Sequence, residues 1–331
     1  MSMILLVNAH GGQRGGSQRS IRSIGIALRN AGHDVQFACP TGPWLRGLSS
    51  LGFVVHPLER SAWMGGKLEQ AGAGNLWRLG RLARSVDIVH TFQYGSYLLA
   101  RAATATVDTA HVHTILGPLS PGHRFARTDR LVSVSLAFAA DAVLAGAEPA
   151  CVTVIPNRVA LDEFGGLGDP SGTRITLISR LEGHLAHAAA HFVEASNRLV
   201  GHEFVVAGDG PAADALRSAG RATFLGHVDD IVGVHADAAI VVGVGRTLLE
   251  GMASGLPCIC LGPTGFGGVV SPDTIVGMAA HNMSGRHRFK PSPDGLTDAI
   301  NDLMADRPKR QMLGRFGQAW VREHYDIRSG I

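Results

Sequence analysis

Cysteine is scarce in this sequence. Only four cysteines occur among 331 residues, and each lies in an apolar run. Their small number and their setting exclude a disulfide framework and favour small core residues in a reducing compartment. Cys258 and Cys260 would point the same way from one strand, which is the spacing of a site, but we expect them to be core residues too.

Long apolar segments are also missing. The first apolar run, at residues 3–7, has five residues and no basic lead-in, which predicts no signal peptide. No run approaches the roughly 20 apolar residues that a membrane-spanning helix needs. We therefore expect a cytoplasmic protein. The arginines that follow Gly16 leave peripheral contact with the inner membrane face open as an alternative to a solvated basic surface.

Charge of one sign is not concentrated anywhere. The formal net charge is +3 and the basic residues are scattered, so no nucleic-acid partner is expected. Histidine is frequent, with 16 residues, but no pair has helical ligand spacing beside a third ligand, and we expect no metal. What remains is a core-rich globular chain, 45% hydrophobic and long enough for two domains.

Short apolar strands alternate with helical segments along this chain. A strand at residues 3–7, a helix at 17–30 and a strand at 34–39 form a β–loop–α–β unit, the building block of a parallel sheet. The same pattern predicts a helix at 76–84 and further strands. These lie at residues 53–55, 87–90, 110–113, 142–144 and 152–155.

A second alternating series follows a linker-like stretch at residues 165–172. Its strands are expected at residues 175–179, 204–207, 222–225, 239–242, 257–261 and 274–276, and a helix at 311–325. The pattern predicts an α/β protein with two doubly wound, Rossmann-like domains, residues 1–165 and 166–312, and a ligand in the cleft between them.

Residues 242–257 carry the strongest functional pattern. A Gly-rich turn and a short helix with one acidic residue lie between two predicted strands. Backbone N–H groups at a helix start attract phosphate, and glycines let an anion approach the backbone closely. Glu250 lies one turn into this helix, where its carboxylate can accept hydrogen bonds from a ribose diol. The stretch predicts a nucleotide site at the carboxyl end of a strand.

A weaker nucleotide pattern occurs at residues 208–213. Gly208-Asp209-Gly210 follows a strand and opens a helix, as in a dinucleotide-binding turn. We favour a structural turn, because Pro211 is a common first helical residue and no acid lies in a fitting place about twenty residues later. A Rossmann dehydrogenase is accordingly the least favoured class.

Several motifs together resemble the retaining GT-B glycosyltransferases of the family 4 group. Glu250 and the run Met-Ala-Ser-Gly-Leu-Pro at residues 252–257 are similar to the second half of that family's donor-site motif. The Gly-Gly pair at residues 15–16, the stretches at 32–35, 155–164 and 179–181, and those at 205–211 and 224–228 also match in order and spacing. The resemblance covers most of the chain and implies the GT-B fold, with a C-terminal helix at residues 313–331 that returns toward the N-terminal domain.

The resemblance implies a retaining glycosyltransferase. It would move a sugar from a nucleoside diphosphate donor of the UDP or GDP type to an acceptor hydroxyl, without metal or any cofactor beyond the nucleotide sugar. The acceptor and the oligomeric state have no readable pattern. The alternatives are a nucleotide-sugar epimerase of the same fold and a nucleotide-binding relative that has lost turnover.

The family's site residues carry over to particular positions here. His113 would hydrogen-bond the donor sugar or the acceptor as charge develops, and Arg180 would pair with the diphosphate. The donor-binding residues implied are Gly15, Gly16, Arg180, Gly245, Arg246, Thr247, Leu248 and Glu250. His111, two residues before His113 on the same strand face, is a further candidate for the sugar or the acceptor. Phe266, Gly267 and Gly268 fit a loop wrapped against the ligand.

Two positions depart from the family's donor site. Val242 stands where the family has its first glutamate, and a valine cannot bind sugar hydroxyls. The family's lysine after Arg180 is also missing, since no lysine occurs between residues 180 and 195. That cation is therefore either missing, with weaker donor binding expected, or replaced by Arg246, His184 or His187.

Overall fold

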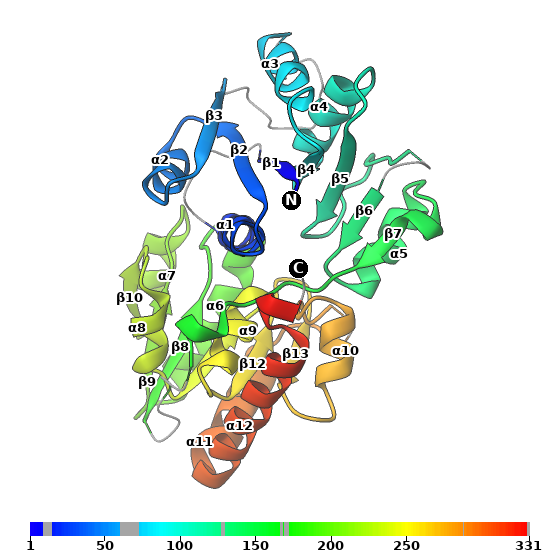
Figure 1. Cartoon of the computed structure of the whole chain (residues 1–331). Helices are drawn as coiled ribbons and strands as arrows, with labels where there is room; N and C mark the ends of the chain where they lie inside the picture. Colours follow the sequence, from blue (N-terminus) through cyan, green and yellow to red (C-terminus); the bar gives the residue numbers. More distant parts are fainter. Residues whose placement is uncertain are drawn as a thin grey trace. The chain divides into compact units, whose positions relative to one another are not determined.

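The computed structural model describes residues 1–8, 15–59, 73–126, 130–165, 168, 172–286 and 288–329. Its contacts divide the chain into two compact α/β units, Met1–Asn157 and Arg158–Ser329 (Figure 1). The predicted architecture of two doubly wound domains is confirmed. The division falls earlier in the chain than the predicted boundary at residue 165, and most of the predicted linker lies outside the described residues.

The described part of the N-terminal unit holds a seven-stranded parallel sheet with the strand order β3-β2-β1-β4-β5-β6-β7. The order reverses between β1 and β4, and doubly wound sheets bind ligands at the carboxyl ends of strands beside such a reversal. The strands are β1 (Met3–Val7), β2 (Asp34–Pro40), β3 (Val54–Leu58), β4 (Ile88–Thr91), β5 (Ala110–Ile115), β6 (Arg130–Ser133) and β7 (Val152–Val154). The helices are α1 (Gly16–Asn30), α2 (Pro43–Ser50), α3 (Ala73–Ala83), α4 (Tyr94–Thr104) and α5 (Leu136–Leu144).

The C-terminal unit holds a six-stranded sheet with the order β10-β9-β8-β11-β12-β13, in which only the edge strand β13 is antiparallel among the described strands. Its order reverses between β8 and β11. The strands are β8 (Arg174–Ile178), β9 (Glu203–Ala207), β10 (Thr223–Gly226), β11 (Ile240–Gly243), β12 (Cys258–Leu261) and β13 (Phe266–Val269). The helices are α6 (Leu185–Arg198), α7 (Ala213–Ala219), α8 (Ile231–Ala236), α9 (Arg246–Ala253), α10 (Ile275–Ala280), α11 (Pro293–Ala305) and α12 (Arg307–His324).

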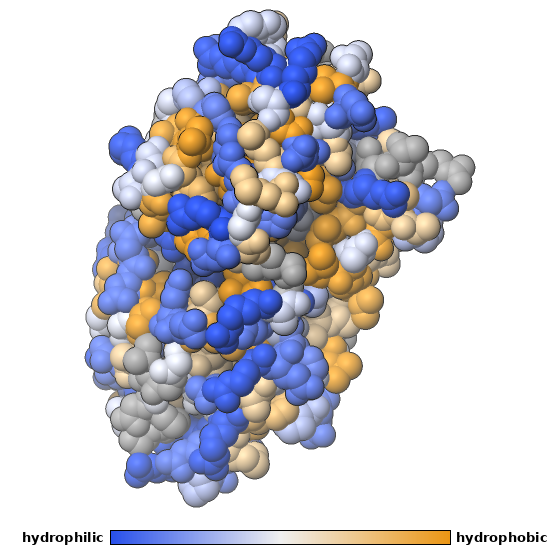
Figure 2. Space-filling view, viewed as in Figure 1, coloured by the Kyte–Doolittle hydropathy of each residue, from blue (hydrophilic) through white to orange (hydrophobic). Residues whose placement is uncertain are grey.

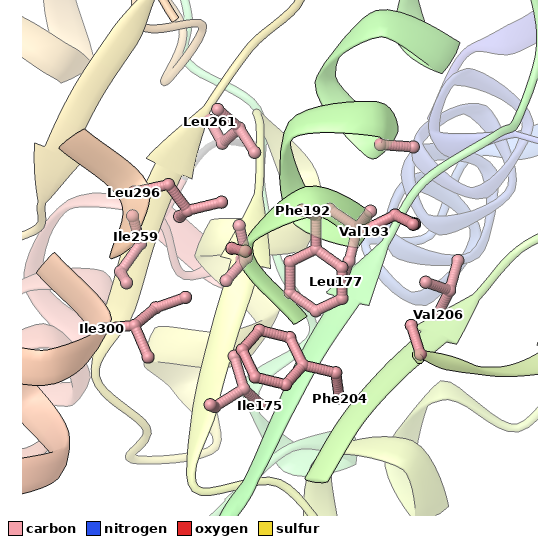
Figure 3. Packing of buried hydrophobic residues seen from close by; sticks show 14 of the residues in the cluster. Ile175, Leu177, Phe192, Val193, Phe204, Val206, Ile259, Leu261, Leu296 and Ile300 are labelled. Atoms are coloured by element: carbon pink, nitrogen blue, oxygen red, sulfur yellow. The ribbon is translucent and has the colours of Figure 1, made fainter. Parts of the chain in front are cut away.

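Apolar side chains cover both faces of the C-terminal sheet, as expected for a mostly parallel sheet. On one face, residues of β8 and β12 pack against α6 and α11, with Leu177 close to Phe192 (Figure 3). On the other face, Leu249 and Met252 of α9 lie in a second core cluster that also includes Val321 of α12. Helix α9 is therefore buried between the sheet and α12.

Glycines allow the close approach of α12 to α9. A Cβ atom at Gly314 would lie 2.0 Å from the carbonyl oxygen of Gly255, and one at Gly317 would lie 2.8 Å from Cγ of Met252. The helix predicted at residues 311–325 is confirmed as α12. Its return toward the N-terminal unit stays a prediction.

Two predicted strands are wrong. Residues 142–144 end helix α5, whose start is capped by Ser135, since its hydroxyl accepts a hydrogen bond from the backbone N–H of Phe138. Residues 275–276 begin helix α10. Both segments are short apolar runs, which fit a helix or a strand equally well. The strands β6 and β13 were not predicted.

The surface offers no membrane-spanning element in the described residues: no helix there is both long enough and apolar enough to cross a bilayer. In the space-filling view, hydrophilic side chains lie over the region of α11 and α12 (Figure 2). The free thiols support the predicted absence of cross-links within the described chain, since all four cysteines are unpaired and three are buried.

The turn at Gly208 and Gly210 is structural, as expected. A Cβ atom at Gly208 would lie 1.7 Å from the carbonyl oxygen of Ser179, and one at Gly210 would lie 2.5 Å from that of Leu181. In the same turn, the carbonyl oxygen of Asp209 accepts a hydrogen bond from the N–H of Leu181 at 3.0 Å. These glycines let the segment after β9 pack directly on the backbone of residues 179–181.

We expect Gly208→Ala to lower the free energy of unfolding by about 3 kcal/mol, because the added methyl group meets backbone that cannot move aside. Urea unfolding of purified protein measures this. The control in the same unit is Gly165→Ala, whose Cβ would meet its nearest atom at 3.7 Å, and which should stay within about 0.5 kcal/mol of wild type. Equal stability of the two variants would contradict the close approach.

Candidate functional site

The reversal of strand order in the C-terminal sheet brings two predicted site segments together. Strand β8 leads into Arg180 and strand β11 leads into the turn before α9, and the two strands pair directly, with Leu177 opposite Val242. The hydroxyl of Thr247 donates to the carbonyl oxygen of Ile178 at 3.4 Å, which links the two segments. Arg180 and the first turn of α9 therefore lie at one edge of the sheet, where nucleotides bind in such folds.

Arg180 presents an exposed guanidinium at this edge. Its side chain is 55% exposed, and Nη1 donates to Oε1 of Glu182 at 2.6 Å. An exposed ion pair of this kind is worth little, roughly 0–1 kcal/mol. Arg180 can therefore exchange its partner for a phosphate at small cost.

Arg246 and Glu250 form a buried ion pair at the start of α9. Nε of Arg246 donates to Oε1 of Glu250 at 2.6 Å, and the two side chains are only 8% and 2% exposed. Nη1 of Arg246 donates to the carbonyl oxygen of Arg158 at 3.0 Å. Removing a charge pair from water is costly unless it is well hydrogen-bonded, and this guanidinium directs two of its donors into the protein.

In the turn before α9, backbone N–H groups that the sequence analysis assigned to a phosphate donate to backbone carbonyls instead. The N–H of Gly245 donates to the carbonyl of Met283, that of Thr247 to Val244 and that of Leu248 to Gly245. The side chain of Leu248 is fully buried. At these three predicted donor-binding residues, the backbone N–H groups already have backbone partners in this structure, so their contact with a phosphate stays a prediction.

Two segments discussed for the sugar site, at Val242 and at residues 266–268, are largely buried in the structure. Val242, at the position of the family's first glutamate, is fully buried in the core. Residues 266–268 were predicted as a loop, and this is wrong: Phe266, Gly267 and Gly268 belong to strand β13, and Phe266 packs in the core. Their contact with a sugar or an acceptor stays a prediction. A Cβ atom at Gly267 would lie 2.9 Å from Cβ of Cys260, so this glycine serves strand packing.

The other replacements for the missing cation lie on the start of α6. His184 is the residue before this helix and His187 is in its first turn, and both are exposed. They follow Arg180 closely in the chain, at the carboxyl end of β8. Their contact with a ligand stays a prediction.

In the N-terminal unit, the predicted glycine pair begins helix α1 after strand β1. Gly15 is the residue before the helix, with a left-handed φ of 131°, and Gly16 is its first residue and exposed. A side chain at Gly15 would be strained, and its Cβ would lie 2.9 Å from Oε1 of Gln18. The glycine pair therefore follows the carboxyl end of β1, beside the point where the strand order of the sheet reverses.

A histidine–threonine cluster occupies the ends of β4 and β5. The hydroxyl of Thr91 lies 2.9 Å from Nδ1 of His113 and 3.0 Å from Nε2 of His111. Thr91 is opposite His113 in the strand register. Sequence reasoning missed Thr91, because only the pairing of β4 with β5 places it beside His113. A second cross-strand pair joins Nε2 of His90 to the hydroxyl of Thr114 at 2.7 Å.

Burial keeps His90 and His113 neutral. Burial lowers the pKa of His113 well below its usual value, and the nearby His111 and His90 lower it further. Burial, with a smaller effect of His111, lowers the pKa of His90 to about 3. His113 is consequently a neutral hydrogen-bonding group, and the Thr91 hydroxyl engages its Nδ1 atom.

Arg158 holds the start of the C-terminal unit to its end. Its Nη1 atom donates to the carbonyl of His324 at 2.8 Å and to the hydroxyl of Ser329 at 3.0 Å. The next residue, Val159, bridges to Asp326 and exchanges backbone hydrogen bonds with Tyr325 and Ile327. Sequence reasoning missed this junction, since its partners are about 165 positions apart in the chain.

A shallow surface pocket lies between α1 and α2 of the N-terminal unit, lined by Gln18, Arg19, Arg22, Trp44, Gly47 and Leu48. It includes two of the arginines that follow Gly16. In the described part of the chain, no three His, Cys, Asp or Glu side chains gather as metal ligands.

Comparison with known proteins identifies the family. The family model for glycosyltransferase family 4 matches residues 14–163, and the model for glycosyl transferases group 1 matches residues 172–306. The two matches lie before and after residues 164–171 and together span most of the chain. The chain therefore belongs to the GT-B glycosyltransferases of the family 4 group.

Particular relatives show how far the similarity extends. A GDP-mannose-dependent α-(1-6)-phosphatidylinositol monomannoside mannosyltransferase of Mycobacterium tuberculosis is 30% identical over 38% of this chain and 36% of that protein. The match thus spans about a third of the curated relative. The HepE protein of Anabaena, crystallised with UDP and glucose, is similar in fold with a TM-score of 0.77 at 17% identity, over 99% of this chain and 97% of that one.

Another solved structure, sucrose-phosphate synthase from Thermosynechococcus elongatus, has a TM-score of 0.75 at 16% identity, over 99% of this chain and 96% of that one. At such identities the likeness shows the fold alone. It confirms the predicted GT-B architecture.

The neutral histidines predict a pH dependence of stability. Below about pH 6.5, His90 and His113 bind protons in the unfolded chain but stay neutral in the folded one. The free energy of unfolding therefore falls as the pH falls. Each histidine adds about 1.4 kcal/mol per pH unit to this loss. Urea unfolding between pH 7.5 and 5 measures the slope, which His113→Gln should reduce by one histidine's share. Val89→Ala, a destabilising control on the same sheet, should keep the slope; an unchanged slope in His113→Gln would refute the buried neutral state.

Proposed function

We propose that this chain transfers a sugar from a nucleoside diphosphate donor to an acceptor hydroxyl, with retention at the anomeric carbon and without a bound metal. The observation that carries the proposal is the placement of the family's motifs. In each unit they lie at the carboxyl ends of strands where the strand order reverses. Gly15 and Gly16 follow β1 in one unit, and Arg180 and the α9 turn follow β8 and β11 in the other.

The C-terminal unit would hold the donor. Arg180 is exposed beside the first turn of α9 and would pair with the diphosphate through its planar guanidinium. Glu250 would accept hydrogen bonds from the ribose hydroxyls. The relatives support both donor types, since the mannosyltransferase is named for GDP-mannose and HepE was crystallised with UDP.

The N-terminal unit would hold the acceptor and supply His113. A neutral imidazole suits a group that hydrogen-bonds the sugar or the acceptor rather than one that takes up a proton. In the proposed step, the bond from the anomeric carbon to the diphosphate breaks, the bond to the acceptor oxygen forms on the same face, and the leaving phosphate receives the acceptor's proton. No protein nucleophile is required.

Location and partners follow the same proposal. The chain would act in the cytoplasm on a nucleotide sugar and an acceptor, and the arginines around the α1–α2 pocket would be available to an anionic acceptor or to the inner membrane face. No nucleic-acid partner is proposed. A nucleotide-sugar epimerase would share the fold but would need no acceptor.

The proposal is tested by binding and turnover without metal. Calorimetry with UDP, GDP and ADP should show binding of one nucleoside diphosphate, and Arg180→Gln should weaken it about tenfold or more through the lost phosphate contact, about 1.4 kcal/mol or more. The control Arg198→Gln removes an equally charged, partly exposed arginine at the far end of α6 and should leave Kd unchanged.

Turnover then separates the enzyme from the alternatives. Consumption of the matching nucleotide sugar with release of the diphosphate supports a transferase. Formation of an epimeric nucleotide sugar would support the epimerase. Binding without any turnover would identify a nucleotide-binding relative, in keeping with the buried Val242 at the position of the missing glutamate.

A further inference from the structure

Four exposed residues of the C-terminal unit bring three cations and one aromatic ring together. Arg286, Arg288, Phe289 and Lys290 lie between helices α10 and α11, and all four are exposed. Phe289 is 67% exposed, although a phenyl ring gains free energy when it leaves water. We call these four residues the basic aromatic surface.

The backbone of this surface is anchored to the sheet. The N–H of Phe266 in β13 donates to the carbonyl oxygen of Phe289 at 2.7 Å, and the two residues form an isolated antiparallel bridge. Nη1 of Arg288 donates to the carbonyl oxygen of Gly267 at 3.5 Å. Cζ of Arg288 lies 5.5 Å from the centre of the Phe289 ring. The exposed ring therefore belongs to an anchored segment and has a cation beside it.

The three cations of this surface have no carboxylate partner among the described residues. Other exposed arginines of the same unit do have one, since Arg198 pairs with Glu194 and Arg217 pairs with Asp214. A paired carboxylate cancels much of the field of its arginine. Three unpaired cations in one short stretch instead create a local positive potential that attracts an anionic partner.

The basic aromatic surface lies at the sheet edge that carries the candidate nucleotide site. Phe266, which bridges to Phe289, is opposite Leu261, the last residue of β12. Phe289 is therefore at the carboxyl edge of the sheet. A few residues earlier, the carbonyl oxygen of Met283 accepts a hydrogen bond from the N–H of Gly245, in the turn before α9. The chain thus passes from the α9 turn directly to the basic aromatic surface.

We propose that the basic aromatic surface attaches the C-terminal unit to an anionic lipid bilayer. The guanidinium and ammonium groups contact lipid phosphates, and the ring of Phe289 enters the boundary between headgroups and acyl chains. A phenyl ring has no hydrogen-bonding group, so it gains from such an apolar medium. Single-stranded nucleic acids are bound by a charged groove with successive aromatic platforms, whereas the described part of this surface offers one phenyl ring.

This inference goes beyond the proposed function, because attachment to a bilayer does not depend on a nucleotide or on sugar transfer. It also assigns the contact to a surface other than the arginines of α1. Attachment here would hold the carboxyl edge of β11 and β12 close to any acceptor that the bilayer carries.

The test measures binding of the full chain to lipid vesicles by co-sedimentation. Vesicles of phosphatidylcholine are compared with vesicles in which about one quarter of the lipid is anionic phosphatidylglycerol. Each cation at an anionic surface strengthens binding about fivefold, so wild type should prefer the anionic vesicles about a hundredfold, and salt should reduce this preference. The triple variant Arg286→Gln, Arg288→Gln, Lys290→Gln should lose the preference.

Phe289→Ser should weaken binding to the anionic vesicles about tenfold, because no ring then leaves water, and this loss should persist in high salt. The matched controls lie on α12. The triple variant Arg307→Gln, Arg315→Gln, Arg322→Gln removes three exposed cations, and Met312→Ser alters an apolar residue that is 51% exposed. Both controls should bind within about twofold of wild type, since they leave the bilayer contact intact.

No binding to the anionic vesicles, or equal binding to both vesicle types, would overturn the inference. An equal loss in the α12 triple variant would also overturn it, because net charge alone would then explain the binding. Binding of a single-stranded oligonucleotide without binding of vesicles would identify a nucleic-acid contact and overturn it as well. None of these measurements requires turnover, so their failure would leave the proposed function standing.

Discussion

The burial of helix α9 is the constraint on which the C-terminal unit depends. The helix lies between β11 and β12 on one side and α12 on the other, and most of its residues are buried. Small residues permit this, since a Cβ atom at Gly251 would lie 2.9 Å from Sγ of Cys258. Because its side chains are buried along most of its length, the helix can contact a ligand only at its first turn. The charged pair of Arg246 and Glu250 begins in that turn.

The same burial explains why the two charges come as a pair. A lone carboxylate at the position of Glu250, which is 2% exposed, would lose its hydration without compensation. Arg246, one helical turn earlier, supplies the opposite charge, and the Arg158 carbonyl fixes Arg246 in turn. Arg158 also binds the end of the unit through His324. The Glu250 carboxylate, the first residue of the unit and its last residues are therefore parts of one hydrogen-bonded arrangement. This arrangement accounts for a unit that begins at residue 158 and not in the Gly-rich stretch at 165–172.

The sequence predicted best what depends on local pattern. Strand β1 and helix α1 were placed nearly to the residue, because a short apolar run beside a helical repeat admits one interpretation. The strand predicted at residues 142–144 was wrong because an alanine-rich apolar run suits a helix or a strand. The N-cap at Ser135 favours the helix. The pairing of Arg246 with Glu250 was not predicted, although their spacing of four fits one face of a helix, because Arg246 was assigned to the diphosphate. Thr91 and the Arg158 junction were not readable, since they depend on strand register and on contacts between the two ends of a unit.

The two candidate sites have contrasting electrostatics, and the proposed chemistry gives a reason for the contrast. The C-terminal reversal offers an exposed cation, Arg180, whereas the N-terminal cluster offers hydroxyl groups and histidines that burial keeps neutral. In transfer from a nucleoside diphosphate, negative charge accumulates on the leaving phosphates, so a cation is needed there. A cation at the sugar would oppose the positive charge that develops at the anomeric carbon. A neutral His113, held by the hydroxyl of Thr91, can hydrogen-bond a sugar or an acceptor without adding that repulsion.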